Sequence, residues 1–389
     1  MSYSIQVWDS VDQIDVAAWK SLQDADDLFM DLRLLRATAN SMVDTDSFRF
    51  LLVRDAEGTP VAATCLWSFM ATGTLLAVDN WIIRTIKRVS SVVSTLNNHR
   101  VLVCGMPVSA GQNNLRFAAG ANRTEILDAL HTKLMSIATS EGLRYIIFKE
   151  FEQVDPEFAA KMTELGYYCA DSLPMNQVDA QWPSFEGYLA TLTSKKRSQI
   201  KNTNKKCRQG EVQLIVTSDP DEVDRVYTDS VHQLYRAVLG NAEAQLETLP
   251  PTFFRNLARQ FPDQTTFSYV LENDTVLAFG VVLYSDQVAY PLYVGVNYDR
   301  NNEYDLYFNV MFSMFEESLR RGVQLVSWGQ TADQFKQMKL NCYQTPRHFF
   351  VTPTNLFSKT LLAAFFPYLF PKRTVAEREV VEVAQRRAA

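Results

Sequence analysis

One short stretch of the chain concentrates the side chains best suited to binding an anion. Residues 194–210 contain no acidic residue and seven cations: Lys195, Lys196, Arg197, Lys201, Lys205, Lys206 and Arg208. Lysine binds phosphate as a point charge, and arginine also through paired hydrogen bonds. The stretch predicts a binding surface for a phosphate, a pyrophosphate or an RNA backbone, and a solvated helix face is the alternative.

Two further groups could act in catalysis or line a ligand tunnel. Glu150 follows the predicted strand 145–148 and is followed by Glu152. Paired acids raise one another's pKa, so Glu150 is a candidate general base, with a hydrated loop carboxylate as the alternative. Tyr293 lies in the apolar stretch 290–296, where it would line a tunnel or pack in the core.

The remaining composition excludes several classes of protein. The chain has neither of the glycine-rich phosphate motifs, GxGxxG and GxxxxGK[ST], and no GxSxG nucleophile motif. Its four histidines are far apart and its five cysteines are scattered, so we expect no metal site and no disulfide framework. The cysteine usage predicts a cytoplasmic protein, and the net charge of −6 argues against a DNA-binding protein.

The 389 residues contain two stretches with the same order of elements. Residues 48–69 and 266–286 each show two apolar runs around a polar turn, which predicts a β-hairpin. An amphipathic helix, a glycine and an apolar strand follow each hairpin. They are residues 125–139, Gly142 and 143–148 in the first copy, and residues 306–321, Gly322 and 323–328 in the second. The repeat predicts two α/β domains of one type.

The repeat also suggests where the domains end. We expect an N-terminal domain over 1–180, a C-terminal domain over 181–355, and an apolar segment with a charged tail over 356–389. The first copy contains an insertion at about 72–115. Within it, residues 81–96 form a basic amphipathic pattern, typical of a helix that packs on its own domain, lies on an anionic membrane or caps a cleft.

With the repeat and the stretch YLATLTSKKR at residues 188–197, the chain resembles tandem GNAT-like N-acyltransferases, nearest to the Fem-type and BioF/CelD-like groups. In that family a leucine-rich helix leads into a Lys/Arg-rich stretch, and a Tyr-Asp pair follows the central strand, here Tyr298-Asp299. An aromatic-Lys pair follows the last glycine-containing strand, here Phe335-Lys336. The resemblance covers nearly the whole chain, best from about 185 to 345. It implies an α/β (α+β) mixed-sheet fold with two tandem GNAT-like acyltransferase domains.

The resemblance also implies an activity, which is transfer of an acyl group from acyl-CoA or an acyl carrier protein to a small-molecule or peptide amine in the cleft between the domains. Acyl-CoA would be a co-substrate, and we expect no permanently bound cofactor. Lys336 would be the catalytic cation and Glu150 the candidate base. The donor-binding residues would be Lys195, Arg197, Lys201, Tyr293, Arg300 and Phe335.

Two alternatives to this activity remain open. The family's pyrophosphate loop corresponds to residues 116–122 and 300–305, and the second of these has no glycine and contains Glu303 and Asp305. A Fem-type transferase that uses aminoacyl-tRNA is one alternative, because it would use the surplus cations of residues 194–210. A non-catalytic GNAT-like binding protein is the other.

The C-terminal stretch 355–372 is strongly apolar, but its uninterrupted core of residues 361–370 is too short to span a bilayer. We expect it to pack on the second domain, and peripheral membrane contact is the alternative. Residues 374–389 predict a short charged helix.

Overall fold

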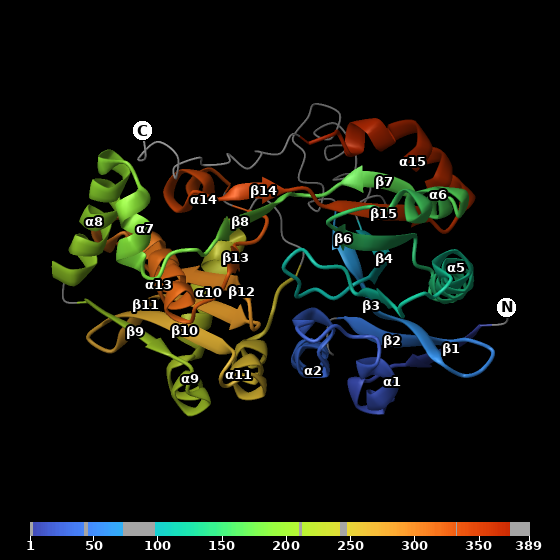
Figure 1. Cartoon of the computed structure of the whole chain (residues 1–389), viewed down its shortest axis with the longest axis horizontal. Helices are drawn as coiled ribbons and strands as arrows, with labels where there is room; N and C mark the ends of the chain where they lie inside the picture. The colour runs from blue at the N-terminus through green and yellow to red at the C-terminus, as the bar shows by residue number, and fades with distance from the viewer. Residues whose placement is uncertain are drawn as a thin grey trace, which may run out of the picture.

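The computed structural model describes residues 3–42, 46–72, 98–209, 212–241, 247–331 and 333–373. Within these residues the chain forms two mixed β-sheets, which lie side by side with helices around them (Figure 1). The mixed α/β class that the sequence predicts is confirmed. The residues 81–96 with the basic amphipathic pattern and the tail 374–389 lie outside the described residues.

The first sheet has the strand order β1-β2-β3-β4-β6-β15-β7, with β5 paired to β3. Its strands are β1 (Ser4–Trp8), β2 (Ser47–Arg54), β3 (Pro60–Thr72), β4 (Asn98–Cys104), β5 (Leu115–Phe117), β6 (Tyr145–Phe151), β7 (Tyr168–Asp171) and β15 (His348–Pro353). The helices of this half are α1 (Val16–Lys20), α2 (Leu32–Ser41), α5 (Arg123–Ser140), α6 (Pro156–Glu164) and α15 (Leu356–Leu369).

The second sheet has the strand order β14-β8-β13-β12-β11-β10-β9. Its strands are β8 (Met175–Asp179), β9 (Val212–Thr217), β10 (Thr265–Glu272), β11 (Thr275–Tyr284), β12 (Val288–Val296), β13 (Leu325–Ser327) and β14 (Tyr343–Thr345). The helices of this half are α7 (Phe185–Thr191), α8 (Ser194–Gln209), α9 (Pro220–Val226), α10 (Asp229–Gly240), α11 (Pro251–Gln260), α12 (Tyr298–Tyr304), α13 (Leu306–Arg320) and α14 (Asp333–Leu340).

The internal repeat is visible in both halves. The two predicted hairpins are the antiparallel pairs β2–β3 and β10–β11. The two predicted helices are α5 and α13, each followed by a strand that pairs in parallel with the last strand of the preceding meander, β6 with β4 and β13 with β12. Gly142 and Gly322 have φ of 66° and 74°, the left-handed conformation that glycine adopts without steric cost after a helix.

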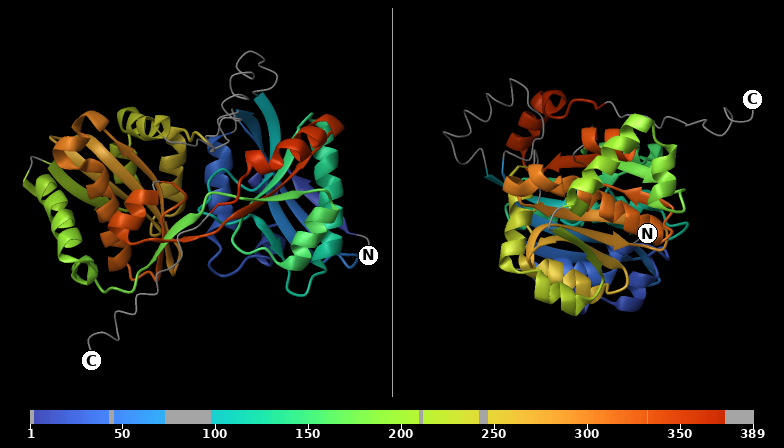
Figure 2. Two further views of the ribbon diagram at one scale, coloured as in Figure 1. Left: turned by 90° about the horizontal axis from the view of Figure 1, so that it is seen from above. Right: turned by 90° about the vertical axis from the view of Figure 1, so that its left-hand side faces the viewer.

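Each sheet is completed by a strand from the other half of the chain. After β7 the chain leaves the first sheet, and β8 inserts between β13 and β14 of the second. At the end of the second half, β15 returns and inserts between β6 and β7 of the first. Figures 1 and 2 show these segments running between the halves. The sheets therefore do not divide at the predicted boundary near residue 180.

Proline explains why the chain crosses instead of turning back. Pro174 lies between β7 and β8, and Pro346 lies between β14 and β15. The residue before a proline is held extended, which opposes a tight hairpin at both places. The two crossing segments also bind each other, because the backbone N–H of Ser172 donates to the carbonyl of Arg347 at 2.7 Å.

One cluster of the hydrophobic core also extends across both halves. Alternate residues of β2 face opposite sides of the first sheet: Phe50 and Leu52 pack with α1 and α2, whereas Leu51 and Val53 pack with α5. The cluster on the α1–α2 side continues into the second half, and the rings of Phe29 and Tyr290 meet edge to face at 5.1 Å.

The C-terminal helix α15 packs on the first half, not on the second domain as expected. The ring of Phe366 lies 5.0 Å from that of Tyr168 in β7, and the ring of Phe370 lies 5.1 Å from that of Phe349 in β15. The reason is the strand exchange, because β15 carries the chain back to the first sheet immediately before α15 begins.

We predict that a substitution in β15 weakens the first half although the residue is close to the C-terminus. Phe350 is fully buried against Phe151 and Phe158, so Phe350→Ala should cost about 3–5 kcal/mol. Hydrogen exchange should show lost protection first in β6 and β7. Loss confined to β10 and β11 of the second half would contradict the strand exchange.

Candidate active site at the junction of the two halves

A group of polar side chains lies where the crossing segments meet the strand ends. We call Lys149, Glu150, Glu247, Tyr293 and Gln330 the junction cluster. Glu150, near the end of β6, is only 5% exposed and has a left-handed φ of 68°. Gln330, which follows β13, donates from its Nε2 to Glu150 Oε2 at 3.0 Å and to the carbonyl of Leu173 at 2.8 Å. The first half thus supplies a buried carboxylate that the second half holds in place.

The other charged members of the cluster come from both halves. Lys149 Nζ donates to Ser109 Oγ at 3.0 Å in the first half, and Tyr293 donates from its hydroxyl to Glu247 Oε1 at 3.2 Å in the second. Lys149, Glu247 and Tyr293 keep part of their surface exposed. The cluster contains one cation and two carboxylates, and the charge of the buried Arg347 also acts on Glu150.

Burial shifts the titration of these groups. It raises the pKa of Glu150 above its ordinary value of 4.5, and the charges of Lys149 and Arg347 only partly oppose this shift. Burial also raises the pKa of Glu247 and lowers the pKa of Lys149. A carboxylate whose pKa is raised toward neutrality is a better proton acceptor, so Glu150 and Glu247 are suited to general-base chemistry.

Arg347 fixes the crossing segment beside this cluster. Its side chain is 2% exposed, and it donates to the carbonyls of Gly111 and Pro346, each at 2.8 Å. It also donates to Thr345 Oγ1 at 2.9 Å and pairs with Glu152 at 3.2 Å. A Cβ at Gly111 would lie 2.9 Å from Arg347 Nε, so the close approach requires glycine there.

The backbone of β12 exposes hydrogen-bond donors near Tyr293. β12 pairs in parallel with β13 only at Val288 and Ala289, and then the two strands separate. Among the strands that the structure describes, none pairs with this edge of β12 beyond Ala289. The register against β11 also shifts at Leu292, between Pro291 and Tyr293. An open strand edge with a bulge presents backbone N–H groups to a ligand, which can stabilise an oxyanion.

Lys336 lies at the other side of this opening. It is 4% exposed, and its Nζ donates to the carbonyl of Trp328 immediately after β13. The next carbonyl, that of Gly329, accepts from the backbone N–H and the side-chain Nδ2 of Asn176 in β8. Since Gln330 follows directly and binds Glu150, one short segment connects Lys336 to the junction cluster. Phe335 stacks on Phe308 with ring centroids 4.9 Å apart and belongs to the core around α13.

The predicted cationic residues of α8 lie elsewhere. α8 lies at the outer end of the second half in both Figures 1 and 2. Lys195 and Lys201 are exposed there. Arg197 donates to the carbonyls of Ala190 and Leu192 at 3.2 and 3.0 Å, so it stabilises the end of α7. The structure brings Glu150 and Tyr293 together but not these three cations.

Arg300 is held in an ion-pair network. Its guanidinium binds Glu272 through two hydrogen bonds of 2.8 Å and Glu303 through a third of the same length. These pairs lower the pKa of Glu272 and of Glu303. Its expected role as a phosphate ligand would require these contacts to break.

The two predicted pyrophosphate loops differ in structure. In the second half, Asp305 precedes α13 as its N-cap residue and pairs with Lys206 of α8 at 3.1 Å, and Asn309 of α13 donates to the carbonyl of Thr203. In the first half, Gly120 lies before α5 with φ of 75°. A Cβ atom at this position would have no heavy atom within 4 Å. The first-half loop is thus open at Gly120, beside a helix N-terminus of the kind that binds phosphate, and the first turn of that helix also contains Glu125.

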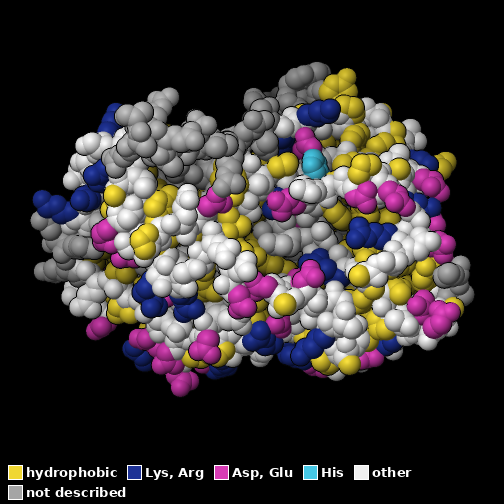
Figure 3. Space-filling model, in the orientation of Figure 1, with side chains coloured by type: hydrophobic (Ala, Val, Ile, Leu, Met, Phe, Trp, Pro, Cys, Tyr) yellow, Lys and Arg dark blue, Asp and Glu magenta, His cyan; other side chains and the backbone are white. Residues whose placement is uncertain are grey.

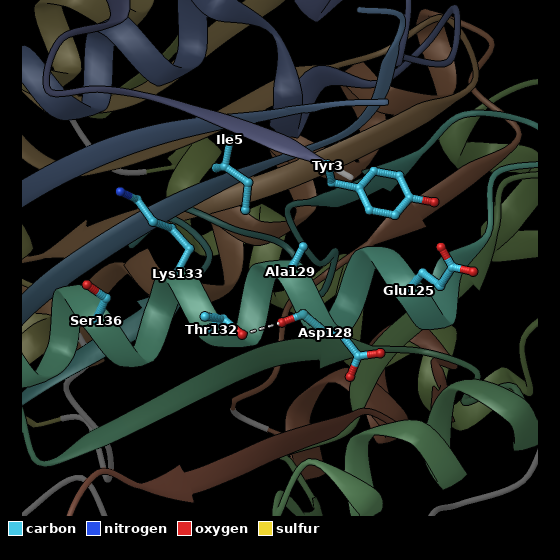
Figure 4. Close-up of a pocket in the computed structure, with 8 residues that line it drawn as sticks. All are labelled: Tyr3, Ile5, Glu125, Asp128, Ala129, Thr132, Lys133 and Ser136. Atoms are coloured by element: carbon cyan, nitrogen blue, oxygen red, sulfur yellow. Dashed lines mark hydrogen bonds between the residues drawn. The ribbon is translucent and has the colours of Figure 1, made fainter. Parts of the chain in front are cut away.

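An open groove of about 720 Å³ lies elsewhere in the first half, between β1 and α5 (Figure 4). Tyr3 and Ile5 line the groove on the side of the strand, and Glu125, Asp128 and Lys133 line it on the side of the helix. None of the junction cluster lines this groove. In the described part of the chain, no group of three or more His, Cys, Asp or Glu side chains is placed to hold a metal ion.

Sequence reasoning missed several residues of the site. Lys149 is adjacent to Glu150 in the run Lys-Glu-Phe-Glu, so its position offered a signal. Gln330 follows the glycine of the predicted last strand, which also marks a strand end. Glu247 and Arg347 have no local signal, because only the tertiary fold brings them to the junction.

Comparisons with known proteins agree with this architecture. Residues 194–337 match the family model described as "Acetyltransferase (GNAT) domain". A crystal structure of FemX aligns with a TM-score of 0.53 at 11% identity, covering 94% of this chain and 99% of that one. A tandem GNAT protein from the clavulanic acid biosynthesis pathway aligns with a TM-score of 0.52 at 11% identity, covering 91% and 99%. No curated protein matches significantly.

These findings define the chain as a tandem GNAT-fold protein. The match to the GNAT domain model lies in its second half, at residues 194–337, and the fold of the whole chain is similar to that of FemX.

We predict that the stability of Glu150→Gln relative to wild type increases as the pH rises. The folded state raises the pKa of Glu150, so it binds that proton more tightly than the unfolded chain does. The resulting stabilisation is present below the unfolded pKa of about 4.5 and is lost as the pH rises through the folded value. The melting temperature of the variant relative to wild type should therefore increase between about pH 5 and pH 8. A decrease would show that the fold favours the ionised carboxylate.

Proposed function

We propose that the protein transfers an acyl group from a thioester to an amine at the junction cluster. The observation that carries this proposal is Glu150, a buried carboxylate with a raised pKa, held at a strand end opposite an open strand edge of a GNAT-type sheet. Acyl transfer to nitrogen needs a base for the ammonium proton and donors for the oxyanion. The junction of the two halves offers both.

The acceptor would bind as an ammonium, because the cluster offers it two carboxylates, Glu150 and Glu247. Glu247, oriented by Tyr293, would pair with it, and Glu150 would accept one proton. The neutral nitrogen then attacks the thioester carbonyl. Backbone N–H groups of β12 beyond Pro291 would donate to the oxyanion, with the ammonium of Lys336 adding positive charge from the strand end. Collapse of the intermediate breaks the C–S bond, the nitrogen loses its remaining excess proton to the leaving thiolate, and the proton on Glu150 is released to solvent.

The donor is acyl-CoA or an acyl carrier protein. If it is acyl-CoA, the loop before α5 is the better pyrophosphate site, because Gly120 leaves space there while Asp305 and α8 cover the start of α13. Release of free thiol from acetyl- to palmitoyl-CoA with a panel of amines tests the proposal. No thiol release above background from CoA and carrier-protein thioesters would favour a non-catalytic binding protein.

The pH dependence of turnover gives a sharper test. Glu150 acts as a base only when ionised, so kcat/KM should fall as the pH drops through its raised pKa. Glu150→Gln should lower kcat by about 10²–10⁴-fold and remove that acid limb. Glu157→Gln is the control, since this carboxylate is exposed on α6 of the same half and is not part of the junction cluster, and it should retain the limb. A Glu150→Gln variant with the wild-type profile would exclude Glu150 as the base.

The catalytic role of Lys336 can be tested against a second lysine of the same helix, α14. Lys336→Met keeps the apolar stem and removes the buried charge, so kcat should fall at least about tenfold through lost charge stabilisation. Lys339→Met on the same helix removes a cation whose Nζ binds Gln199, outside the junction, and should leave kcat close to wild type. Equal effects of the two variants would assign Lys336 to helix packing only.

A second candidate function is aminoacyl transfer from a charged tRNA. The exposed cations Lys195, Lys201 and Lys205 of α8, without an acidic residue in that helix, favour a polyanionic donor. Transfer of radiolabel from aminoacyl-tRNA to an amine acceptor identifies this function. Thiol release from acyl-CoA without such transfer assigns the first.

A further inference from the structure

The C-terminal helix α15 has two apolar faces, and only one of them is covered. Its inner face includes Leu362, which is 5% exposed, and Phe366, which contacts Tyr168. Its outer face exposes large apolar side chains, with Leu356 at 82%, Phe365 at 40% and Tyr368 at 52%. These are three of the nine exposed large hydrophobic side chains in the described part of the chain, and the other six are spread over five elements or loops. A helix that served only to cover the sheet would not need them.

Helix α5 of the same half shows what a covering helix looks like here. Its inner face is apolar, with Ile126, Leu130 and Leu134 buried. Its exposed positions carry polar side chains such as Asp128 and Thr132. In α15 the exposed positions that the structure describes are Leu356, Lys359, Thr360, Ala363, Ala364, Phe365, Pro367 and Tyr368, of which Lys359 and Thr360 are polar and Tyr368 has a hydroxyl. The outer face of α15 is therefore apolar beyond what packing on the first half requires.

The charge around this face indicates its partner. Residues 354–373 contain Lys359, Lys372 and Arg373 and no acidic residue, although the whole chain has a net charge of −6. Lys359 and Lys372 are exposed. Asp171, next to the end of α15, accepts from the backbone N–H of Arg373 at 2.9 Å and lies 3.2 Å from His348 Nδ1. Figure 3 shows hydrophobic atoms over α15, at the upper right of the view.

We propose that α15 docks the protein onto an anionic membrane surface. Leu356, Phe365 and Tyr368 enter the boundary between headgroups and acyl chains, and Lys359 and Lys372 contact lipid phosphates. Apolar area gives this mode of binding its strength, and cations add attraction to anionic lipid. No described helix is long and apolar enough to cross a bilayer, so α15 lies along the surface. A second copy of the chain fits the patch less well, because the same cations would face each other across a twofold axis.

Vesicle sedimentation of the full chain tests this docking surface. Wild type should bind vesicles of phosphatidylcholine with phosphatidylglycerol at least tenfold more tightly than vesicles of phosphatidylcholine alone, and added salt should weaken the binding. The double variant Phe365→Ser/Tyr368→Ser should lose at least tenfold in partitioning to both. Lys359→Gln/Lys372→Gln should lose the preference for phosphatidylglycerol and the salt dependence.

Controls separate docking from misfolding and self-association. Met338→Ser removes a side chain that is 56% exposed on α14 and should bind vesicles like wild type. Melting temperatures of the α15 variants should stay within a few degrees of wild type, because the changed side chains are exposed. Wild type that stays in the supernatant with phosphatidylglycerol vesicles overturns the proposal. So does unchanged binding of Phe365→Ser/Tyr368→Ser, or a dimer that this variant converts to a monomer without lipid.

Discussion

The reciprocal exchange of β8 and β15 is the constraint on which the rest of the structure depends. Each sheet is incomplete without a strand from the other half, so the strand ends next to the crossing are fixed relative to each other. Ser172 and Arg347 join the two crossing segments directly. This is why Gln330 of the second half can hold Glu150 of the first at hydrogen-bond distance. A flexible linker between two independent domains would not give that precision.

Desolvation at the same place explains the chemistry that the junction can support. Isolated buried charges are costly, and proteins retain them where they are paired or where they act. Lys149, Glu150 and Glu247 are only partly compensated, since burial shifts all three pKa values toward the neutral form. Glu150 also keeps a left-handed backbone that most residues avoid. The strained backbone and the desolvated carboxylate of Glu150 therefore lie at the same strand end, which the crossing segments hold in place.

Local patterns in the sequence predict the elements but not their exchange. The hairpins at β2–β3 and β10–β11, the helices α5 and α13, and the glycines Gly142 and Gly322 follow from alternation, helical periodicity and turn chemistry. The insertion of β15 beside β6 depends on contacts between residues about 200 apart, which no local pattern encodes. For the same reason Glu150 and Tyr293 could be named from sequence, whereas Glu247 and Arg347 could not. The charge of Arg300 was visible, but its partner Glu272 was not.

The two copies of the repeat differ in structure at equivalent positions. Lys161 in α6 and Lys336 in α14 occupy equivalent positions of the repeat. Lys161 pairs with Asp128 and Glu164 on the surface, which offsets its charge, whereas Lys336 is buried against the end of β13. Conversely, the loop at Gly120 is open while α12 and Asp305 fill the equivalent place in the second half. The buried lysine near the strand opening therefore belongs to one copy of the repeat and the open loop before a helix to the other, and the exchanged strands join the two copies.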